Sequence, residues 1–243
     1  MSYKTVLPLL VLAGGEGTRL KKIGNSDLKI FTPIGNRLFI EEYLDNLKRL
    51  GFKEIIFLIH EESELTTKKF QEYLNTYDFK FSFLFDGKKR MGTGGAIINN
   101  LDNLPDIFWI MYGDTLLNFN VLEAQKAFFE SKKDSLMTII PKNLVEEKAN
   151  IEFKNNEIIN YSKKSSVQKN YVDYGGLIFK KSAFYNLDNE YVDLDKIIKR
   201  LIDKKSVYHL KVLKRFYEMG NIKSYKTLDN LLKHKKLEQL WDE

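Results

Sequence analysis

Residues 9–20 read LLVLAGGEGTRL. The stretch opens with an apolar run of strand length, and the glycines that follow let the backbone come close to a ligand. Successive backbone N–H groups in such a loop can converge on anionic oxygens, and Arg19 adds a planar donor that suits phosphate. The stretch therefore predicts a strand that ends in a phosphate-binding loop. A plain tight turn between a strand and a helix is the alternative for a bare glycine-rich run.

Two better-known phosphate-binding loops do not fit these residues. The P-loop ends in Gly-Lys-Ser or Gly-Lys-Thr, whereas Gly17 is followed here by Thr18 and Arg19. The dinucleotide fingerprint requires a third glycine at the position that Leu20 occupies. A third kind of nucleotide loop is therefore the better interpretation.

Length and composition predict one large α/β domain with a closed core, since the chain has 243 residues of which 43% are hydrophobic. The absence of cysteine excludes disulfides, thiolate metal sites and cysteine nucleophiles. The first residues lack the pattern of a signal peptide, and no stretch approaches the ~20 apolar residues of a membrane span. We expect a cytoplasmic protein without a membrane partner.

The net charge of +6 arises from 39 basic and 33 acidic residues. The lysines are scattered, with the densest clusters at residues 88–90, 196–205 and 233–236. A nucleic-acid-binding protein would more often carry one basic stripe interleaved with aromatic residues. The charge therefore favours a solvated lysine-rich surface with no nucleic-acid partner, and nucleic-acid binding stays an alternative that only the charge supports.

Apolar runs and helical spacing alternate along the first part of the chain. They predict strands over residues 6–13, 54–59, 80–85, 107–111 and 135–140, and helices over residues 39–50, 63–75 and 121–132. This alternation is typical of a Rossmann-like α/β fold with a mostly parallel sheet that has helices on both faces. Ligands of such sheets bind beyond the carboxyl ends of the strands, where residues 14–19 lie.

Two further strand ends carry candidate site residues. Residues 86–97, DGKKRMGTGGAI, place three glycines in four positions, which would let the backbone reach a flat ligand before a helix begins at Ala96. A flexible turn is the alternative there. Residues 112–115, YGDT, place Asp114 at the mouth of the sheet, where its carboxylate could hold Mg²⁺ or simply cap a turn.

The pattern changes after residue 140. An antiparallel hairpin is predicted over residues 149–161, and single strands over residues 171–179 and 207–212, before a C-terminal helix from about Lys223. The three histidines, His60, His209 and His234, match no motif and are interpreted as structural. This later part predicts a small antiparallel subregion beside the parallel sheet.

Together these stretches resemble the sugar-phosphate nucleotidyltransferases, and most of all the small bacterial heptose-1-phosphate guanylyltransferases and sugar-1-phosphate nucleotidyltransferases. Residues 14–20 match the family's Gly-Gly-x-Gly-Thr-Arg-Leu signature, and Lys29 stands about ten residues further on, with Leu28 where the family usually has proline. Residues 91–97 and the pair Gly113-Asp114 match two further motifs. The resemblance runs from residue 9 to about residue 225, and no hexapeptide repeats of an appended β-helix are present.

The resemblance implies one domain over residues 1–243, with a nucleotide-binding half over residues 1–140 and a sugar-phosphate-binding half over residues 141–243. It implies that the catalytic residues are Arg19, Lys29 and Asp114, with Mg²⁺ held by Asp114 and Glu218. The nucleotide-binding residues it implies are Leu12, Ala13, Gly14, Gly15, Gly17, Thr18, Asp86, Gly92, Thr93 and Gly94. On the sugar side it implies Lys164 or its neighbour Lys163 for the phosphate, and Tyr174, Gly175 and Gly176 along the sugar.

The function implied by the resemblance is transfer of a nucleoside monophosphate from a nucleoside triphosphate to a sugar 1-phosphate. The products would be pyrophosphate and a nucleotide sugar for cell-surface polysaccharide synthesis. A non-catalytic nucleotide-sugar sensor is the alternative, suggested by Leu28, by the missing family glutamate before Lys163, and by Glu218 in place of the commoner aspartate. The base, the sugar and the oligomeric state stay open, with a homodimer as one option.

Overall fold

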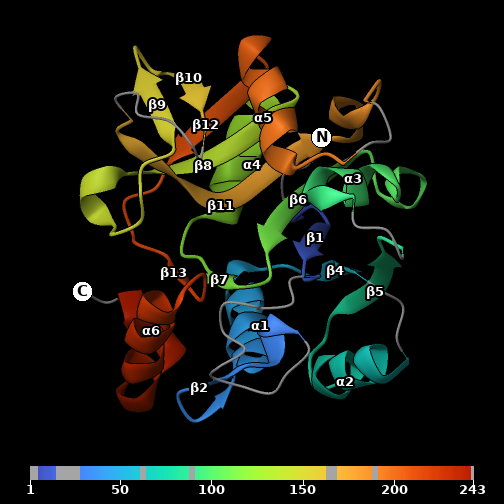
Figure 1. Cartoon of the computed structure of the whole chain (residues 1–243), viewed down its shortest axis with the longest axis vertical. Helices are drawn as coiled ribbons and strands as arrows, with labels where there is room; N and C mark the ends of the chain where they lie inside the picture. Colours follow the sequence, from blue (N-terminus) through green and yellow to red (C-terminus); the bar gives the residue numbers. More distant parts are fainter. Residues whose placement is uncertain are drawn as a thin grey trace.

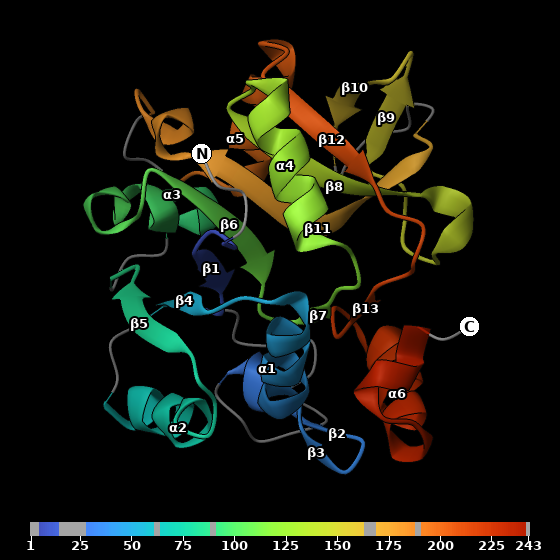
Figure 2. The ribbon, with the colours of Figure 1, turned by 180° about the vertical axis from the view of Figure 1, so that it is seen from behind.

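One nine-stranded sheet runs through the centre of the computed structural model, which describes residues 5–14, 28–60, 64–87, 91–162, 169–187 and 191–241 (Figures 1 and 2). Its strands are β1 (Leu9–Leu12), β4 (Glu54–Ile59), β5 (Lys80–Phe85), β6 (Ile107–Tyr112), β8 (Ser135–Pro141), β9 (Ile151–Lys154), β10 (Glu157–Tyr161), β11 (Tyr171–Lys180) and β12 (Val207–Lys211). The order is β10-β9-β11-β6-β1-β4-β5, and β8 pairs with both β11 and β12.

The central strands β6-β1-β4-β5 are parallel, as the sequence predicted. Leu12 at the end of β1 lies opposite Leu58 of β4 and Tyr112 of β6, and Ile59 of β4 lies opposite Phe85 of β5. The carboxyl ends of these strands therefore meet at one edge of the sheet, where ligands of open α/β sheets bind.

Helices cover both faces of the sheet, which confirms the predicted layering. The helices are α1 (Phe39–Leu50), α2 (Glu64–Leu74), α3 (Gly92–Ile98), α4 (Val121–Ser131), α5 (Leu194–Asp203) and α6 (Ile222–His234). Alternate residues of β1 point to opposite faces. Leu9 and Val11 join a core with α1, α2, α4 and α6, whereas Leu10 joins a second core with α3 and α5.

Helix α1 shows how local sequence sets these elements. Its apolar residues recur at helical spacing, and Tyr43, Leu44 and Leu47 are fully buried against the sheet. Burying a large apolar side chain stabilises the fold by roughly 1.5–3 kcal/mol. The helix begins where the Glu41 carboxylate accepts a hydrogen bond from the Leu38 N–H (2.9 Å), and it ends at Gly51, whose φ of 87° is left-handed.

The antiparallel subregion also forms as predicted. Strands β9 and β10 make a hairpin whose turn residues Asn155 and Asn156 have φ of 51° and 61°, a conformation that asparagine tolerates. Strand β11 runs antiparallel to both β6 and β8, so it joins the parallel strands to this subregion. The small strands β7 (Thr115–Leu116) and β13 (Tyr217–Glu218) pair antiparallel beneath this junction, and β2 (Pro33–Ile34) pairs with β3 (Arg37–Leu38).

The structure corrects one prediction about helices and adds one helix that was not predicted. Helix α3 begins at Gly92, so its glycines lie inside the helix and not ahead of it. Helix α5 was not predicted, because its lysines were interpreted as part of a basic cluster. These lysines lie on the exposed side, while Leu194, Ile197 and Leu201 are buried at helical spacing.

No helix in the described ranges combines the length and the apolar character that crossing a bilayer requires.

Candidate active site

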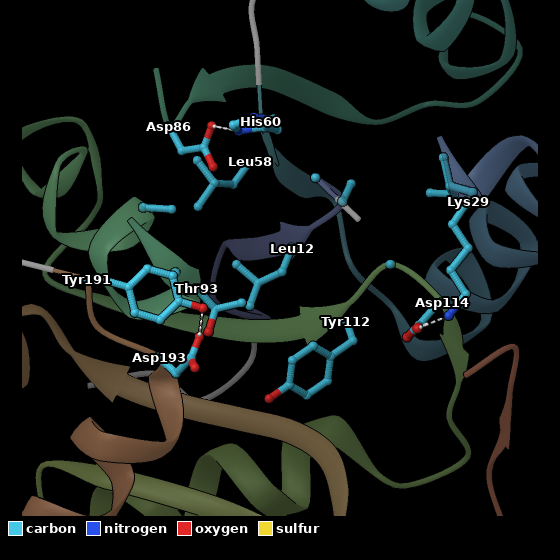
Figure 3. Close-up of a pocket in the computed structure, with 16 residues that line it drawn as sticks. Leu12, Lys29, Leu58, His60, Asp86, Thr93, Tyr112, Asp114, Tyr191 and Asp193 are labelled. Atoms are coloured by element: carbon cyan, nitrogen blue, oxygen red, sulfur yellow. Dashed lines mark hydrogen bonds and ion pairs between the residues drawn. The ribbon is translucent and has the colours of Figure 1, made fainter. Parts of the chain in front are cut away.

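A cavity of about 370 Å³ opens at the carboxyl edge of the four parallel strands (Figure 3). Its volume lies in the range of small-molecule sites. The predicted nucleotide-binding residues that line it are Leu12, Ala13, Gly14, Asp86, Gly92 and Thr93. Gly15, Gly17, Thr18, Arg19, Lys163 and Lys164 lie outside the described residues, so their predicted roles stay predictions.

One end of the cavity carries an ion pair between Lys29 and Asp114, with Nζ 2.5 Å from Oδ2 (Figure 3). The Thr115 hydroxyl donates to the other carboxylate oxygen of Asp114 at 2.9 Å. The side chains of Lys29 and Asp114 are 14% and 30% exposed. The structure therefore brings together two of the three residues predicted to be catalytic, in a partly dehydrated setting that strengthens electrostatic interactions.

Local packing fixes both members of this ion pair. Lys29 begins a 3-10 helix whose next residues, Ile30 and Phe31, are buried in the core. Asp114 lies in the turn between β6 and β7, and its carbonyl accepts a hydrogen bond from the Met219 N–H (2.9 Å). Gly113 lets this turn approach β1, because a Cβ there would lie 3.2 Å from the Leu12 carbonyl oxygen. The rigid surroundings hold Lys29 and Asp114 at the strand edge.

The other end of the cavity carries a hydrogen-bonded pair of Asp86, which was predicted as nucleotide-binding, and His60, which was not. His60 directly follows β4 and Asp86 directly follows β5, and the distance between His60 Nδ1 and Asp86 Oδ1 is 2.8 Å. Burial raises the pKa of Asp86, and the hydrogen bond with His60 opposes that rise. His60 was interpreted as structural, and the structure places it on the lining of the cavity. Its position immediately after a predicted parallel strand is the signal that could have identified it.

The middle of the cavity is apolar. Leu12 and Leu58 line it between the two polar ends, and Tyr112 stands on the side toward the antiparallel strands (Figure 3). Such a surface suits a flat, uncharged ring better than a phosphate chain. The cavity therefore has a charged end, an apolar middle and a hydrogen-bonding end.

Residues 191–194, where the chain enters α5, close one side of the cavity. Hydrogen bonds tie this segment to α3, from the Val192 N–H to the Met91 carbonyl (2.8 Å), from the Gly95 N–H to the Val192 carbonyl (2.9 Å), and from the Leu194 N–H to the Thr93 hydroxyl (2.9 Å). Tyr191 and Asp193 of this segment line the cavity. Their participation was not predicted, because it depends on how α5 packs against α3.

This packing also explains why two of the predicted glycines must be small. Gly92 lines the cavity with φ of +75°, and a Cβ there would lie 2.6 Å from the Val192 carbonyl oxygen. Gly94 does not line the cavity, and a Cβ on it would lie 2.9 Å from the same oxygen and 2.8 Å from Ile197 Cδ1. The small size of Gly94 therefore admits a neighbouring segment of protein, and its contact with the nucleotide stays a prediction.

We expect Gly94→Ala to lower the free energy of unfolding by about 1–3 kcal/mol, because the added methyl group overpacks the contact between α3 and α5. Urea denaturation followed by circular dichroism measures the change. Lys199→Ala, on the exposed side of α5, serves as the control and should stay within about 0.5 kcal/mol of wild type. Equal midpoints for both variants would contradict the close packing described for Gly94.

A second cavity, of about 200 Å³, lies on the far side of Tyr112, which lines both. Asp173, Gly175 and Glu218 contribute to it, so this is where the predicted sugar side falls. Gly175 has φ of +97° and its N–H donates to the Asp173 carboxylate at 3.0 Å. Its backbone therefore forms part of a polar wall.

Of the two other residues predicted along the sugar, Tyr174 lines the second cavity and Gly176 does not. The Tyr174 side chain is fully buried, and its hydroxyl donates to the Asn118 carbonyl (3.0 Å) and accepts from the Asn118 N–H (2.9 Å). Both the N–H and the carbonyl of Gly176 bond to the Thr138 hydroxyl, at 3.0 and 2.7 Å. Hence the Tyr174 hydroxyl and the Gly176 backbone stabilise the fold beneath the cavity.

The two carboxylates predicted to hold Mg²⁺ come from the turn before β7 and from its partner strand β13. In the pairing of β13 with β7, Glu218 lies opposite Thr115, the residue after Asp114. Asp114 lines the first cavity and Glu218 the second. Within the described part of the chain, no three His, Asp or Glu side chains form a metal cluster. Two carboxylates supply hard oxygen ligands. This number fits Mg²⁺, which commonly takes one or two protein carboxylates and completes its shell with substrate phosphates and water.

Comparisons with known proteins agree with this architecture. The profile of the nucleotidyl transferase family matches residues 9–235. A D-glycero-alpha-D-manno-heptose 1-phosphate guanylyltransferase from Campylobacter jejuni is 31% identical over 112 residues, which make up 46% of this chain and 49% of that protein. The matched parts span about half the length of the curated relatives.

Solved structures share the fold at low sequence identity. A protein from Bacillus anthracis described as a glucose-1-phosphate thymidylyltransferase, in complex with sucrose, has a TM-score of 0.79 and 17% identity, covering 94% of this chain and 96% of its own. HddC from Yersinia pseudotuberculosis, complexed with GMP-PN, has a TM-score of 0.72 and 19% identity, covering 92% and 98% of the two chains. These solved structures therefore share the fold of this chain over most of its length.

Proposed function

We propose that this chain, which belongs to the nucleotidyl transferase family, transfers a nucleoside monophosphate from a nucleoside triphosphate to a sugar 1-phosphate. The products are pyrophosphate and a nucleotide sugar, which would serve as a precursor for cell-surface polysaccharide. The sugar 1-phosphate acceptor is suggested by relatives such as the heptose 1-phosphate guanylyltransferase. One observation carries the proposal, namely the Lys29–Asp114 ion pair at the strand edge of a nucleotide-sized cavity.

The reaction follows from what these groups can do. An oxygen of the sugar phosphate attacks the α-phosphorus, a new P–O bond forms, and the bond to the β-phosphate breaks with its electron pair leaving on pyrophosphate. No covalent enzyme intermediate is needed, so the protein positions the reactants and neutralises charge. Lys29 would stabilise negative charge that develops at the α-phosphate. Arg19 would hold pyrophosphate, and Lys164 or Lys163 would hold the acceptor phosphate.

Asp114 and Glu218 would together hold Mg²⁺. When bound, the cation neutralises charge on the triphosphate and the acceptor phosphate. Lys29 contacts one oxygen of Asp114 in this structure, and Thr115 contacts the other.

We expect Glu218→Gln to require several-fold more Mg²⁺ for half-maximal turnover, because it removes one of two carboxylates from an ion that tolerates little loss of ligation. A magnesium titration of initial rates measures this shift. Glu157→Gln, on the exposed hairpin, is the control and should leave the titration unchanged. An unchanged titration for Glu218→Gln would remove Glu218 from the metal site and strengthen the sensor alternative.

The proposed function is tested by a substrate panel. The nucleoside triphosphates of guanine, adenine, cytosine, uracil and thymine are each incubated with several sugar 1-phosphates, and pyrophosphate release is followed with Mg²⁺ and with EDTA. Release that needs a triphosphate, a sugar 1-phosphate and Mg²⁺ together supports the enzyme. Tight calorimetric binding of a nucleotide sugar without release in any combination would favour the non-catalytic sensor.

A further inference from the structure

The hydrogen-bonding end of the cavity lies far from the charged end along the strand edge. The strands follow the order β6-β1-β4-β5, so Asp114 after β6 and Asp86 after β5 are separated by three strand spacings, roughly 14 Å. The apolar residues Leu12 and Leu58 line the cavity between them (Figure 3). A nucleotide with its phosphates near Asp114 would place its base against the apolar middle and direct the base edge toward Asp86.

The chemistry of this end is set by the His60–Asp86 pair. An ionised carboxylate only accepts hydrogen bonds, so His60 Nδ1 is the donor in the 2.8 Å contact. In the neutral ring this leaves Nε2 as an acceptor, and the carboxylate keeps acceptor capacity beyond the one bond from His60. The Asp86 side chain is 16% exposed. Because little water reaches this carboxylate, a ligand that supplies N–H groups would stabilise it through hydrogen bonds.

The five common bases differ in what they offer such an acceptor. Guanine presents a ring N–H and an amino group side by side, which match the two oxygens of a carboxylate. Cytosine and adenine present an amino group beside a ring nitrogen that is itself an acceptor, and the lone pair of that nitrogen would face a carboxylate oxygen that has no hydrogen to donate. Uracil and thymine present one ring N–H between two carbonyl oxygens.

We propose that Asp86, held in position by His60, recognises the nucleobase and selects guanine. This inference rests on the proposed function, since it requires a nucleotide to lie in this cavity with its phosphates at the Lys29 end. It assigns His60 a positioning role, because its Nδ1–H orients the carboxylate that contacts the base. GTP is then the nucleotide substrate.

The test compares nucleotides in direct binding, without the sugar phosphate, so that recognition is measured apart from turnover. Inosine triphosphate is the most informative ligand, because it differs from GTP only by the missing amino group. A good bidentate contact discriminates by roughly 1–3 kcal/mol. We therefore expect wild-type protein to bind GTP about 10-fold or more tighter than inosine triphosphate, and tighter than the triphosphates of the other four bases.

Asp86→Asn should reduce the ratio of GTP to inosine triphosphate affinity toward one, because its amide places a donor against the donors of guanine. His60→Ala should reduce the ratio in the same direction, and His60→Gln should restore part of it by supplying an N–H to Asp86. Glu72→Gln, an exposed carboxylate on α2, is the control and should keep the wild-type ratio. Circular dichroism of each variant confirms that the fold is retained.

The outcomes separate this inference from the proposed function. Strongest binding of another base, or an Asp86→Asn variant with an unchanged ratio, overturns guanine selection even where transfer activity is found. Guanine-selective binding that depends on Asp86, but with no transfer to any sugar 1-phosphate, supports this inference and overturns the proposed function. Absence of binding for every nucleotide overturns both.

Discussion

Asp114→Asn reduces pyrophosphate release by about 10³-fold or more while leaving the fold intact. The substitution removes a negative charge at a strand edge and no core contact, since the side chain is 30% exposed. Asparagine keeps one side-chain oxygen, which can accept from Thr115, while the contact with Lys29 is lost. The Met219 N–H still donates to the backbone carbonyl of residue 114, so the local structure should persist. Circular dichroism and a coupled pyrophosphate assay on the same preparation separate the two effects.

Asp102→Asn provides the control for the first prediction, because Asp102 is an exposed aspartate outside the cavity. It should turn over at the wild-type rate. Turnover of Asp114→Asn within a few-fold of the control would mean that this carboxylate does not serve the metal or the reacting phosphates.

The second large effect is expected for Lys29→Ala. The lysine cation gains most interaction energy as charge develops on the α-phosphate, so its removal should lower kcat by roughly 10²–10³ while KM changes little. Steady-state kinetics with varied nucleoside triphosphate shows how much of the loss lies in kcat and how much in KM. Arg19→Ala should behave in the same way for the departing pyrophosphate.

The matched control for Lys29→Ala is Lys53→Ala, which removes an exposed lysine outside the cavity and should change neither constant. A loss confined to KM in Lys29→Ala would show that the lysine binds the ground state and the transition state equally. In that case its role would be nucleotide binding and not catalysis.

The sequence predicted the parallel part of the fold well because its signals are local. Strands β4 and β5 were predicted with their observed bounds, as was helix α1, since continuous apolar runs and helical spacing identify such elements directly. Helix α5 was missed because its lysines were interpreted as a basic cluster and not as the exposed side of an amphipathic helix. The two-residue strands β7 and β13 carry no local pattern, and they exist because the chain after β6 meets the chain before α6.

The candidate site could be predicted only where it follows a motif. Lys29 and Asp114 were identified through the resemblance, and the structure places them in contact. The pair of His60 with Asp86 depends on which strands are neighbours and on their register, with Ile59 opposite Phe85, and neither is readable from spacing. The packing role of Gly94 was not predicted for a similar reason, because the partner that requires its small size, Val192, lies almost a hundred residues away.

The central claim is nucleotidyl transfer, and the fate of the α-phosphate tests it most directly. The triphosphate that gives the highest rate is supplied in two forms, labelled with ³²P at the α- or the γ-position, together with its sugar 1-phosphate. We expect the α-label to appear in the nucleotide sugar and the γ-label in pyrophosphate. A γ-label on the sugar phosphate, or an α-label in free nucleoside monophosphate that forms equally well without the sugar, would contradict the claim.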